Sequence, residues 1–376
     1  MEGKIRTMNC DFYMPTEIVS GKNCVLAHSH YFAVTGSKCL IVTGASSAKK
    51  SGALADVITG LGQNNVEYII FDGIGQNPTF AQCLEAAEVA RKSKAEFLIG
   101  IGGGSPLDAT KAIAALALYP GMDEQEAYST SFTRVLPYFL IGTTAGTGSE
   151  VTRYAILTNS NNEKKNLCSP LFFAKASFCN PRYTYSLPEQ ITISTALDAL
   201  AHAIESYFSK RANEISDIYA LRALKLTSGA LFAIQEYGFS CVDEAMRDNL
   251  YMGSILAGLA INNTGTLFPH PLGYPLSEEY GVPHGTACGV YSPALLDWCM
   301  EHSKQKALDL LAYLGLGSMA ALTNMIKGFV KVDITMNSGE IERIAQRSKS
   351  TSNFANTPGE FGVKDATAIL NNIFLK

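Results

Sequence analysis

The first half of this 376-residue chain alternates short apolar, β-branched segments with longer segments of helical composition. This alternation is typical of a parallel sheet covered by helices, because parallel neighbours need long crossover connections. Buried strands are predicted at residues 38–43, 68–71, 97–101 and 138–141, each followed by a loop with Gly, Ser or Thr. Ligands of such sheets bind at the carboxyl ends of strands, so we expect a ligand site at that edge.

The second half of the chain has a different composition. After Asn180-Pro181 it becomes rich in Ala, Leu and Ile, and segments 193–209, 215–237 and 243–259 have the length and spacing of packed helices. A chain of this length usually forms two domains of about 100 to 200 residues each. We predict an α/β domain with a parallel sheet over residues 1–180 and an all-α domain over residues 181–376.

A glycine-rich turn follows the predicted strand 97–101. Gly102, Gly103 and Gly104 lead into Ser105 and a helical segment that contains Asp108. Glycines let the backbone approach a phosphate closely, and the free N–H groups of a helix start can hold a pyrophosphate. An ordinary strand-to-helix turn is the alternative, because a glycine run alone is weak evidence.

A second loop of this kind follows the predicted strand 138–141. It places the hydroxyl groups of Thr143, Thr144, Thr147 and Ser149 between glycines. Two such loops on one sheet indicate a large phosphorylated ligand, so we predict a Rossmann-like dinucleotide-binding domain; a flexible surface loop is the alternative. Neither loop fits the G-x-G-x-x-G fingerprint with its later acidic residue.

The segment after strand 38–43 bears on the choice of cofactor. An NAD site commonly has an acidic residue there for the ribose 2′-OH, whereas a 2′-phosphate requires donors and no acid. Here Gly44 is followed by Ser46, Ser47 and Lys49, with no acidic residue. The sequence therefore predicts a preference for NADP(H), with NAD(H) as the alternative.

Asp198 and His202 are four residues apart in a segment of helical composition, so both can reach one cation. Such a pair alone is more often an ordinary hydrogen bond. The chain has only six histidines, and two others, His270 and His284, bracket a Gly/Pro-rich stretch. One carboxylate and three imidazoles suit a divalent first-row transition metal, and iron, zinc, manganese and cobalt all fit this donor set.

At this point the sequence resembles the iron-containing alcohol dehydrogenase family, from Phe12 to at least Pro293. The resemblance rests on four motifs in order: Gly102-Gly103-Gly104-Ser105, Thr144-Ala145-Gly146-Thr147-Gly148-Ser149-Glu150, Asp198-Ala199-Leu200-Ala201-His202-Ala203-Ile204-Glu205 and Pro283-His284-Gly285. It implies an α/β cofactor domain facing a helical domain that carries the metal.

The resemblance also implies the chemistry. Asp198, His202, His270 and His284 would hold one divalent metal, Fe²⁺ with Zn²⁺ as the alternative, in an enzyme that reduces aldehydes or oxidises primary alcohols. Gly44 is similar to the NADP-using branch. The expected partners are a small alcohol or aldehyde and further copies of the chain, in a homodimer or larger homo-oligomer.

The sequence departs from the family pattern at Tyr274, where a histidine is usual four residues after the third ligand. A phenol with a pKa near 10 is a poor proton acceptor, so we assign Tyr274 to substrate positioning in the active site. Glu205 follows His202 by one turn, where it could orient a ligand imidazole or be a solvated helix residue.

Two other functions fit parts of this pattern. A glycerol dehydrogenase-like or 3-dehydroquinate synthase-like enzyme would use the same scaffold, but those relatives have fewer histidine ligands. A dinucleotide-binding sensor without chemistry would explain Tyr274. An assay of aldehyde-dependent NADPH oxidation separates the sensor from the dehydrogenase.

Composition excludes other classes of partner. The formal net charge is −4 and no Lys/Arg-rich run occurs, so nucleic acid is not expected. Neither a signal peptide nor a run long enough to cross a bilayer is evident, which predicts a cytoplasmic protein without membrane contact. The nine cysteines contain no CxxC pair, and we interpret them as small residues kept reduced, many of them buried.

Overall fold

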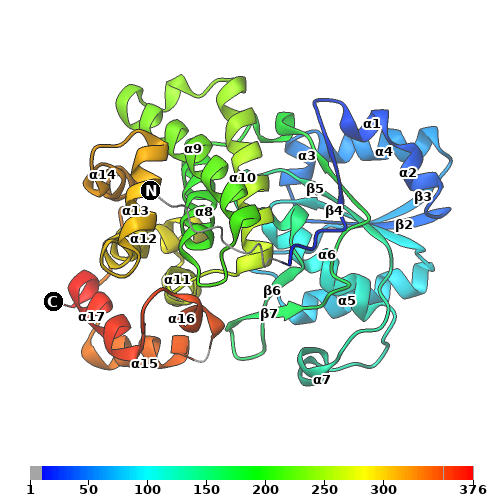
Figure 1. Ribbon diagram of the computed structural model, residues 1–376. Helices are drawn as coiled ribbons and strands as arrows, with labels where there is room; N and C mark the ends of the chain where they lie inside the picture. The colour runs from blue at the N-terminus through cyan, green and yellow to red at the C-terminus, as the bar shows by residue number, and fades with distance from the viewer. Residues whose placement is uncertain (1–10, 350, 376) are drawn as a thin grey trace.

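The structure, a computed structural model, describes residues 11–349 and 351–375 and has an α/β half and a helical half (Figure 1). The α/β half consists of β1 (Glu17–Ser20), α1 (Cys24–Ala27), α2 (His30–Ala33), β2 (Lys38–Thr43), α3 (Ser47–Lys50), α4 (Ala53–Gln63), β3 (Glu67–Phe71), α5 (Phe80–Ser93), β4 (Phe97–Gly102), α6 (Gly104–Leu116), α7 (Glu124–Ser129), β5 (Tyr138–Gly142), η1 (Ser149–Val151), β6 (Tyr154–Thr158), β7 (Lys164–Cys168), β8 (Ala176–Cys179) and η2 (Pro181–Thr184). The helical half consists of α8 (Glu189–Phe208), α9 (Glu214–Tyr237), η3 (Phe239–Cys241), α10 (Glu244–Thr264), α11 (Pro269–Glu279), α12 (His284–His302), α13 (Lys304–Leu314), α14 (Met319–Phe329), α15 (Ser338–Lys349), α16 (Ser352–Asn356) and α17 (Val363–Phe374).

The main sheet has six parallel strands in the order β1-β8-β5-β4-β2-β3. The direction in which the chain crosses the sheet reverses between β2 and β4. Doubly wound sheets bind ligands at such a reversal, outside the carboxyl ends of the two strands. The predicted parallel α/β fold is confirmed, and its reversal point lies between the Gly44 segment and the Gly102–Gly104 turn.

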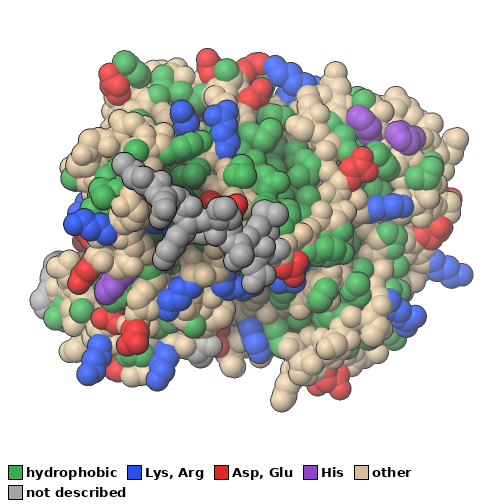
Figure 2. All heavy atoms as spheres, viewed as in Figure 1, with side chains coloured by type: hydrophobic (Ala, Val, Ile, Leu, Met, Phe, Trp, Pro, Cys, Tyr) green, Lys and Arg blue, Asp and Glu red, His purple; other side chains and the backbone are tan. Residues whose placement is uncertain are grey.

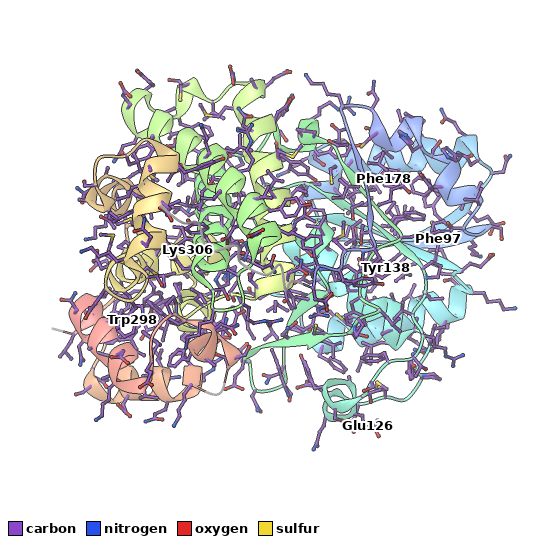
Figure 3. The ribbon with its side chains drawn as sticks, in the orientation of Figure 1. Phe97, Glu126, Tyr138, Phe178, Trp298 and Lys306 are labelled. Carbon is purple, nitrogen blue, oxygen red and sulfur yellow. The ribbon has the colours of Figure 1, made fainter. Side chains whose placement is uncertain are left out.

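Alternation of side chains along β2 explains how both faces of the sheet are covered. Leu40 and Val42 pack with α5 and α6, while Cys39 and Ile41 pack with α4 on the opposite face. The two helix layers are visible above and below the sheet (Figure 1). An aromatic cluster that includes Phe97 and Phe178 reinforces one layer (Figure 3).

Strands β1, β8, β6 and β7 were not predicted from the sequence. β1 and β8 have only four residues each, too few to show a periodic pattern, yet β8 lies between β5 and β1 in the sheet. β6 and β7 form a separate antiparallel hairpin. Short strands of this kind are stabilised by their neighbours in the sheet, which a local pattern cannot reveal.

The predicted helical character of the second half is confirmed. The segments 193–209, 215–237 and 243–259 lie within α8, α9 and α10. Helix α8 is the centre of this half, since it packs against α9, α10 and α12 and is buried over most of its length. The Gly/Pro-rich stretch after His270 also forms a helix, α11, despite the internal Pro275.

The last strand of the main sheet ends at Cys179, and the first long helix begins at Glu189. Among the described residues no single helix is long and apolar enough to cross a membrane; α13 and α14 meet that test only as a pair, which is bent by 75°. On the face shown in Figure 2, Lys and Arg side chains are interspersed with Asp and Glu side chains.

Candidate functional site

Helix α8 carries two of the predicted metal ligands. Asp198 and His202 lie one turn apart on the same face of α8, with His202 Nε2 3.8 Å from Asp198 Oδ1. Both side chains are buried, and Asp198 is only 2% exposed.

The other two predicted ligands reach Asp198 from neighbouring helices. His270 stands near the start of α11 and His284 is the first residue of α12, with Nε2 atoms 3.9 and 3.8 Å from Asp198 Oδ1. The approach of α12 depends on Gly285, because a Cβ atom there would lie only 1.9 Å from the carbonyl oxygen of Ser194 in α8. The absence of a side chain therefore brings His284 to the cluster.

The geometry of this cluster fits a metal ion. Two ligands bound at about 2.1 Å with tetrahedral angles lie about 3.4 Å apart, a little less than the 3.8–3.9 Å found here. Asp198 Oδ1 and His270 Nε2 are buried without a hydrogen-bond partner. Buried polar atoms normally have a partner, so these two atoms fit the binding of a cation. The donor set of one carboxylate and three imidazoles suits a divalent transition metal.

The three histidines of the cluster favour the neutral form of the imidazole. Burial lowers the pKa of His202, lowers that of His270 to about 4 and lowers that of His284 well below its usual range. The Lys164 ammonium adds to the effect on the pKa of His284. A neutral imidazole has the lone pair that a metal needs.

Glu205 orients His270, so the reading of Glu205 as a solvated helix residue is wrong. Its side chain is fully buried, and its Oε1 lies 2.6 Å from His270 Nδ1. Its Oε2 accepts a hydrogen bond from the Leu267 backbone N–H at 2.6 Å. Binding of a metal to Nε2 requires the shared proton on Nδ1, where Glu205 accepts it.

Tyr274 lies beside the cluster on α11. Its ring stacks against His284 with centroids 5.8 Å apart, and Lys164 Nζ lies 5.6 Å from the ring centroid on the hairpin side. Burial raises the pKa of Tyr274, so the phenol keeps its proton at neutral pH and does not accept one.

Cys288 is a neighbour of the cluster that sequence reasoning missed. It is buried one turn after His284 on α12, and its thiol lies close to His284, His270 and Asp198. The other described cysteines are free thiols, five of them buried, and Cys10 lies outside the described residues.

The two glycine-rich loops touch each other at the carboxyl edge of the sheet. A Cβ atom at Gly103 would lie 3.1 Å from Thr144, and one at Gly104 would lie 2.6 Å from Thr147. Gly104 begins α6, so free N–H groups of a helix start lie at this contact. The loops therefore form one continuous surface of backbone amides and hydroxyl groups.

Both loops open into the cleft that contains the buried cluster. The cleft has a volume of about 990 Å³. Its lining includes these predicted site residues: Gly104, Ser105, Asp108, Thr147, Ser149, Asp198, His202, His270, Tyr274 and His284. Lys164, Thr266 of the loop between α10 and α11, and Asn356 of α16 also line it, and none of them was predicted as a site residue. The remaining predicted cofactor residues lie outside this lining: Gly44, Ser46, Ser47, Lys49, Gly102, Gly103, Thr143 and Thr144.

Asp108 and Ser149 are engaged within the protein. Ser149 Oγ donates to Asp108 Oδ1 at 2.5 Å, and Asp108 Oδ2 accepts from the Ile156 backbone N–H at 3.0 Å. The buried Lys111 ammonium donates to both Ser149 Oγ and Asp108 Oδ1. These contacts tie α6 to the second loop and to β6, which gives Asp108 and Ser149 a positioning role.

The segment predicted to select the cofactor lies at the reversal point of the sheet. Gly44 follows β2 directly, and Ser46 immediately precedes the short helix α3 that contains Ser47 and Lys49, without a side-chain capping bond. Lys49 Nζ forms an ion pair with Asp72 Oδ2 at 3.1 Å, and both side chains are more than half exposed. An acidic residue thus reaches this segment from the end of β3.

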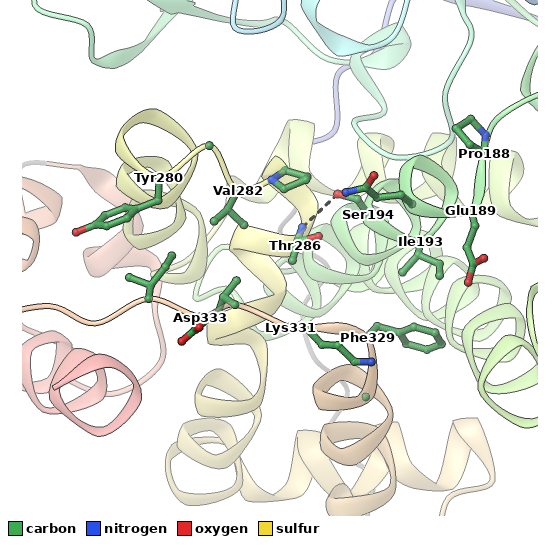
Figure 4. Close-up of a pocket in the computed structure, with 16 residues that line it drawn as sticks. Pro188, Glu189, Ile193, Ser194, Tyr280, Val282, Thr286, Phe329, Lys331 and Asp333 are labelled. Atoms are coloured by element: carbon green, nitrogen blue, oxygen red, sulfur yellow. Dashed lines mark hydrogen bonds between the residues drawn. The ribbon is translucent and has the colours of Figure 1, made fainter. Parts of the chain in front are cut away.

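A second cavity, of about 840 Å³, lies between the start of α8, the end of α11 and the segment after α14 (Figure 4). Ser194 Oγ accepts a hydrogen bond from the Thr286 backbone N–H at 3.3 Å across its wall. This contact fastens α12 to α8 behind His284. The cavity is lined by none of the four predicted metal ligands, so the larger cleft is the candidate site.

Comparison with known proteins covers nearly the whole chain. Residues 15–181 match the family described as iron-containing alcohol dehydrogenase, and residues 192–374 match the C-terminal part of the Fe-containing alcohol dehydrogenase family. A 1,3-propanediol dehydrogenase of Citrobacter freundii is 32% identical over 82% of this chain and 78% of its own.

Solved structures agree with this result. An iron-containing alcohol dehydrogenase of Thermotoga maritima superposes with a TM-score of 0.89 at 34% identity, covering 97% of this chain and 99% of its own. A sulfoacetaldehyde reductase of Bifidobacterium kashiwanohense, solved with NAD⁺, superposes with a TM-score of 0.86 at 26% identity, covering 98% and 99%.

Proposed function

Because the chain belongs to the iron-containing alcohol dehydrogenase family and is an NAD(P)-dependent alcohol oxidoreductase, we propose that it interconverts small aldehydes and primary alcohols with NADP(H) and one divalent metal. Asp198, His202, His270 and His284 hold the metal in this proposal. Fe²⁺ is the expected ion and Zn²⁺ the alternative.

One observation carries the proposal. Three imidazole Nε2 atoms lie 3.8–3.9 Å from Asp198 Oδ1, a buried oxygen without a hydrogen-bond partner. The same cleft is lined by both glycine-rich loops. A metal and a dinucleotide bound at these places would meet within one cleft, as hydride transfer requires.

The chain's own residues orient the reactants. A bound divalent metal supplies Lewis acidity to the substrate oxygen, and the nicotinamide supplies or takes up the hydride. Glu205 holds Nδ1 of His270, which leaves Nε2, 3.9 Å from Asp198 Oδ1, available to the metal. Tyr274 keeps its proton and positions the substrate beside His284. The two loops hold the pyrophosphate through backbone N–H groups and hydroxyl groups.

The preference for NADP(H) rests on the segment that follows β2. Gly44 carries no acidic group, Ser46 and Ser47 offer hydroxyl groups, and Lys49 offers a cation. The Lys49–Asp72 ion pair opposes this preference, because a 2′-phosphate must compete with Asp72 for Lys49. The test compares kcat/KM for NADPH and NADH in wild type and in Asp72→Asn, which should favour NADPH further. Equal or lower efficiency with NADPH in wild type contradicts the preference.

The substrate class comes from the relatives. One relative is named a 1,3-propanediol dehydrogenase and another a lactaldehyde reductase. Polar side chains of Thr266 and Asn356 line the cleft on the helical side, where they can accept or donate hydrogen bonds to a second hydroxyl group. Short hydroxyaldehydes are therefore the first substrates to assay.

The experiment that tests the proposal combines metal analysis with an activity screen. We expect about one Fe²⁺ or Zn²⁺ per chain and NADPH oxidation in the presence of small aldehydes. Chelation should abolish that activity, and returning the metal should restore it. Full activity in metal-free protein contradicts the proposed chemistry, whereas dinucleotide binding with neither metal nor activity supports the sensor function.

A further inference from the structure

The thiol of Cys288 lies beside three of the predicted metal ligands, Asp198, His270 and His284. Cys288 lies one turn after His284 on α12, and its Sγ is 3.8 Å from His284 Nδ1 and 3.9 Å from His284 Nε2. One ligand atom from each of Asp198, His270, His284 and Cys288 lies within 4.8 Å of the others. The thiol is fully buried in this group and not on the far side of the helix.

These separations suit a thiolate and imidazoles on one ion. A tetrahedral zinc with bonds of about 2.3 Å to sulfur and 2.0–2.1 Å to nitrogen separates those atoms by about 3.6 Å. The 3.9 Å between Cys288 Sγ and His284 Nε2 is close to that value, and Sγ also lies 3.8 Å from Nδ1, so the sulfur faces the imidazole ring. Rotation of the Cys288 or His284 side chain brings the sulfur to the side of an ion held by Asp198 and His284.

Two other atoms of this group are buried polar atoms without a hydrogen-bond partner, which is an independent indication of a ligand. Asp198 Oδ1 and His270 Nε2 are buried, with residue exposures of 2% and 3%, and neither has a hydrogen-bond partner. Both belong to the set that includes the thiol. A cation at this point would satisfy them, and Cys288 Sγ would be in its reach.

We propose that Cys288 is an additional metal ligand that selects for thiophilic ions, so that Co²⁺ or Cd²⁺ binds to Asp198, His270, His284 and Cys288. The inference rests on the proposed function, because three of the four ligands are shared. On binding, the sulfur–metal bond forms, the thiol proton leaves to solvent, and no redox change occurs. The soft sulfur donor favours thiophilic ions, whereas Fe²⁺ favours the harder oxygen and nitrogen donors. The thiol of Cys288 therefore raises the affinity of the site for Co²⁺ and Cd²⁺ relative to Fe²⁺.

The test is the absorption spectrum of the Co²⁺-loaded protein. A Co²⁺–thiolate bond gives a charge-transfer band in the near ultraviolet that oxygen and nitrogen ligands do not give. We expect the band in wild type, its loss in Cys288→Ser and in Cys288→Ala, and its retention in Cys299→Ser. Cys299 is a matched control, because it is also fully buried on α12.

Competition between ions provides the second readout. Cys288→Ser should weaken Cd²⁺ binding by at least about tenfold, because a bond to the ion is lost, while Fe²⁺ binding should change little. Bound Co²⁺ without the band in wild type overturns the role of Cys288 and leaves the proposed function intact. Failure of wild type to bind Co²⁺, Fe²⁺ or Zn²⁺ at all overturns the metal centre itself.

Discussion

Two buried charged clusters, around Lys111 and around Asp198, lie at the same cleft. They differ in whether their buried polar atoms have hydrogen-bond partners within the protein. The Lys111 ammonium is fully buried and has four acceptors around its three N–H groups: Asp108 Oδ1, Ser149 Oγ, Thr152 Oγ1 and the Tyr154 carbonyl, at 2.7–3.3 Å. Burial lowers the pKa of Lys111, and the nearby Asp108 carboxylate opposes that shift. This cluster is complete without any ligand.

In the cluster around Asp198, by contrast, a buried carboxylate oxygen has no hydrogen-bond partner. Asp198 Oδ1 is surrounded by three imidazole nitrogens, none of which is within hydrogen-bonding distance, and it has no other partner. An unsatisfied buried carboxylate costs stability, so a protein that keeps one holds it for a ligand. The contrast supports a structural role for Lys111 and the proposed metal-binding role of Asp198.

Replacing Asp198 should produce the largest effect on activity. Asp198→Ala removes the only carboxylate from the proposed ligand set, and we expect kcat to fall by about a thousandfold or more. Its melting temperature without metal should equal or exceed that of wild type, since a buried carboxylate oxygen without a partner is removed and no protein partner is lost. Near-normal turnover of Asp198→Ala would contradict the metal-binding role of Asp198.

Replacing Lys111 should produce the opposite pattern. Lys111→Met leaves Asp108 without its buried cation, and we expect a loss of about 3 kcal/mol in the free energy of unfolding. Lys49→Met is the control, because the exposed Lys49–Asp72 pair should contribute less than about 1 kcal/mol. Denaturant unfolding measures both variants. A stable Lys111→Met protein would show that this cluster is not structural.

Replacing Glu205 tests the Asp198 cluster more finely, because it changes the hydrogen bond to the proposed ligand His270 and leaves all four proposed ligands in place. Glu205→Gln keeps the shape and weakens the hold on His270 Nδ1, so metal affinity should fall by about 10–100-fold. Competition with a chelator measures this affinity. If the metal affinity of Glu205→Gln equals that of wild type, Glu205 serves packing alone.

The smallest effect concerns pH and the metal-free protein. His202 and His284 have folded-state pKa values below 6.5, so the unfolded chain takes up protons first and stability falls as the pH drops below 6.5. Each such histidine contributes a slope of about 1.4 kcal/mol per pH unit. His270 contributes little net slope, because burial raises the pKa of its partner Glu205 in compensation.

His284→Gln tests this pH dependence. Unfolding curves of the metal-free variant between pH 6.5 and 5 should depend less on pH than those of wild type. Equal slopes would mean that His284 is protonated in the folded protein.

The glycine-rich edge of the sheet was predictable from the sequence because its determinants are local, whereas the binding of a cofactor there stays a prediction. A strand, a glycine turn and a helix start are contiguous at Gly102–Gly104, so one stretch of sequence reveals the whole feature. The i and i+4 spacing of Asp198 and His202 is likewise local. The homo-oligomeric state stays a prediction.

The rest of the site depends on packing between distant segments. Cys288, Lys164 and Lys111 reach the cleft or its wall only because α12, the β6–β7 hairpin and α6 pack there. The role of Glu205 likewise depends on His270, which arrives from another helix. No spacing rule joins residues on separate elements, so the sequence alone left these contacts undetermined.

The central claim is that one metal ion binds at Asp198 Oδ1 among three imidazoles. Anomalous diffraction at the iron absorption edge from crystals of the Fe²⁺-loaded, active enzyme tests it most directly. We predict one strong peak within about 2.0–2.4 Å of Asp198 Oδ1 and the Nε2 atoms of His202, His270 and His284. An active crystal with its peak elsewhere, or with none, would contradict the account.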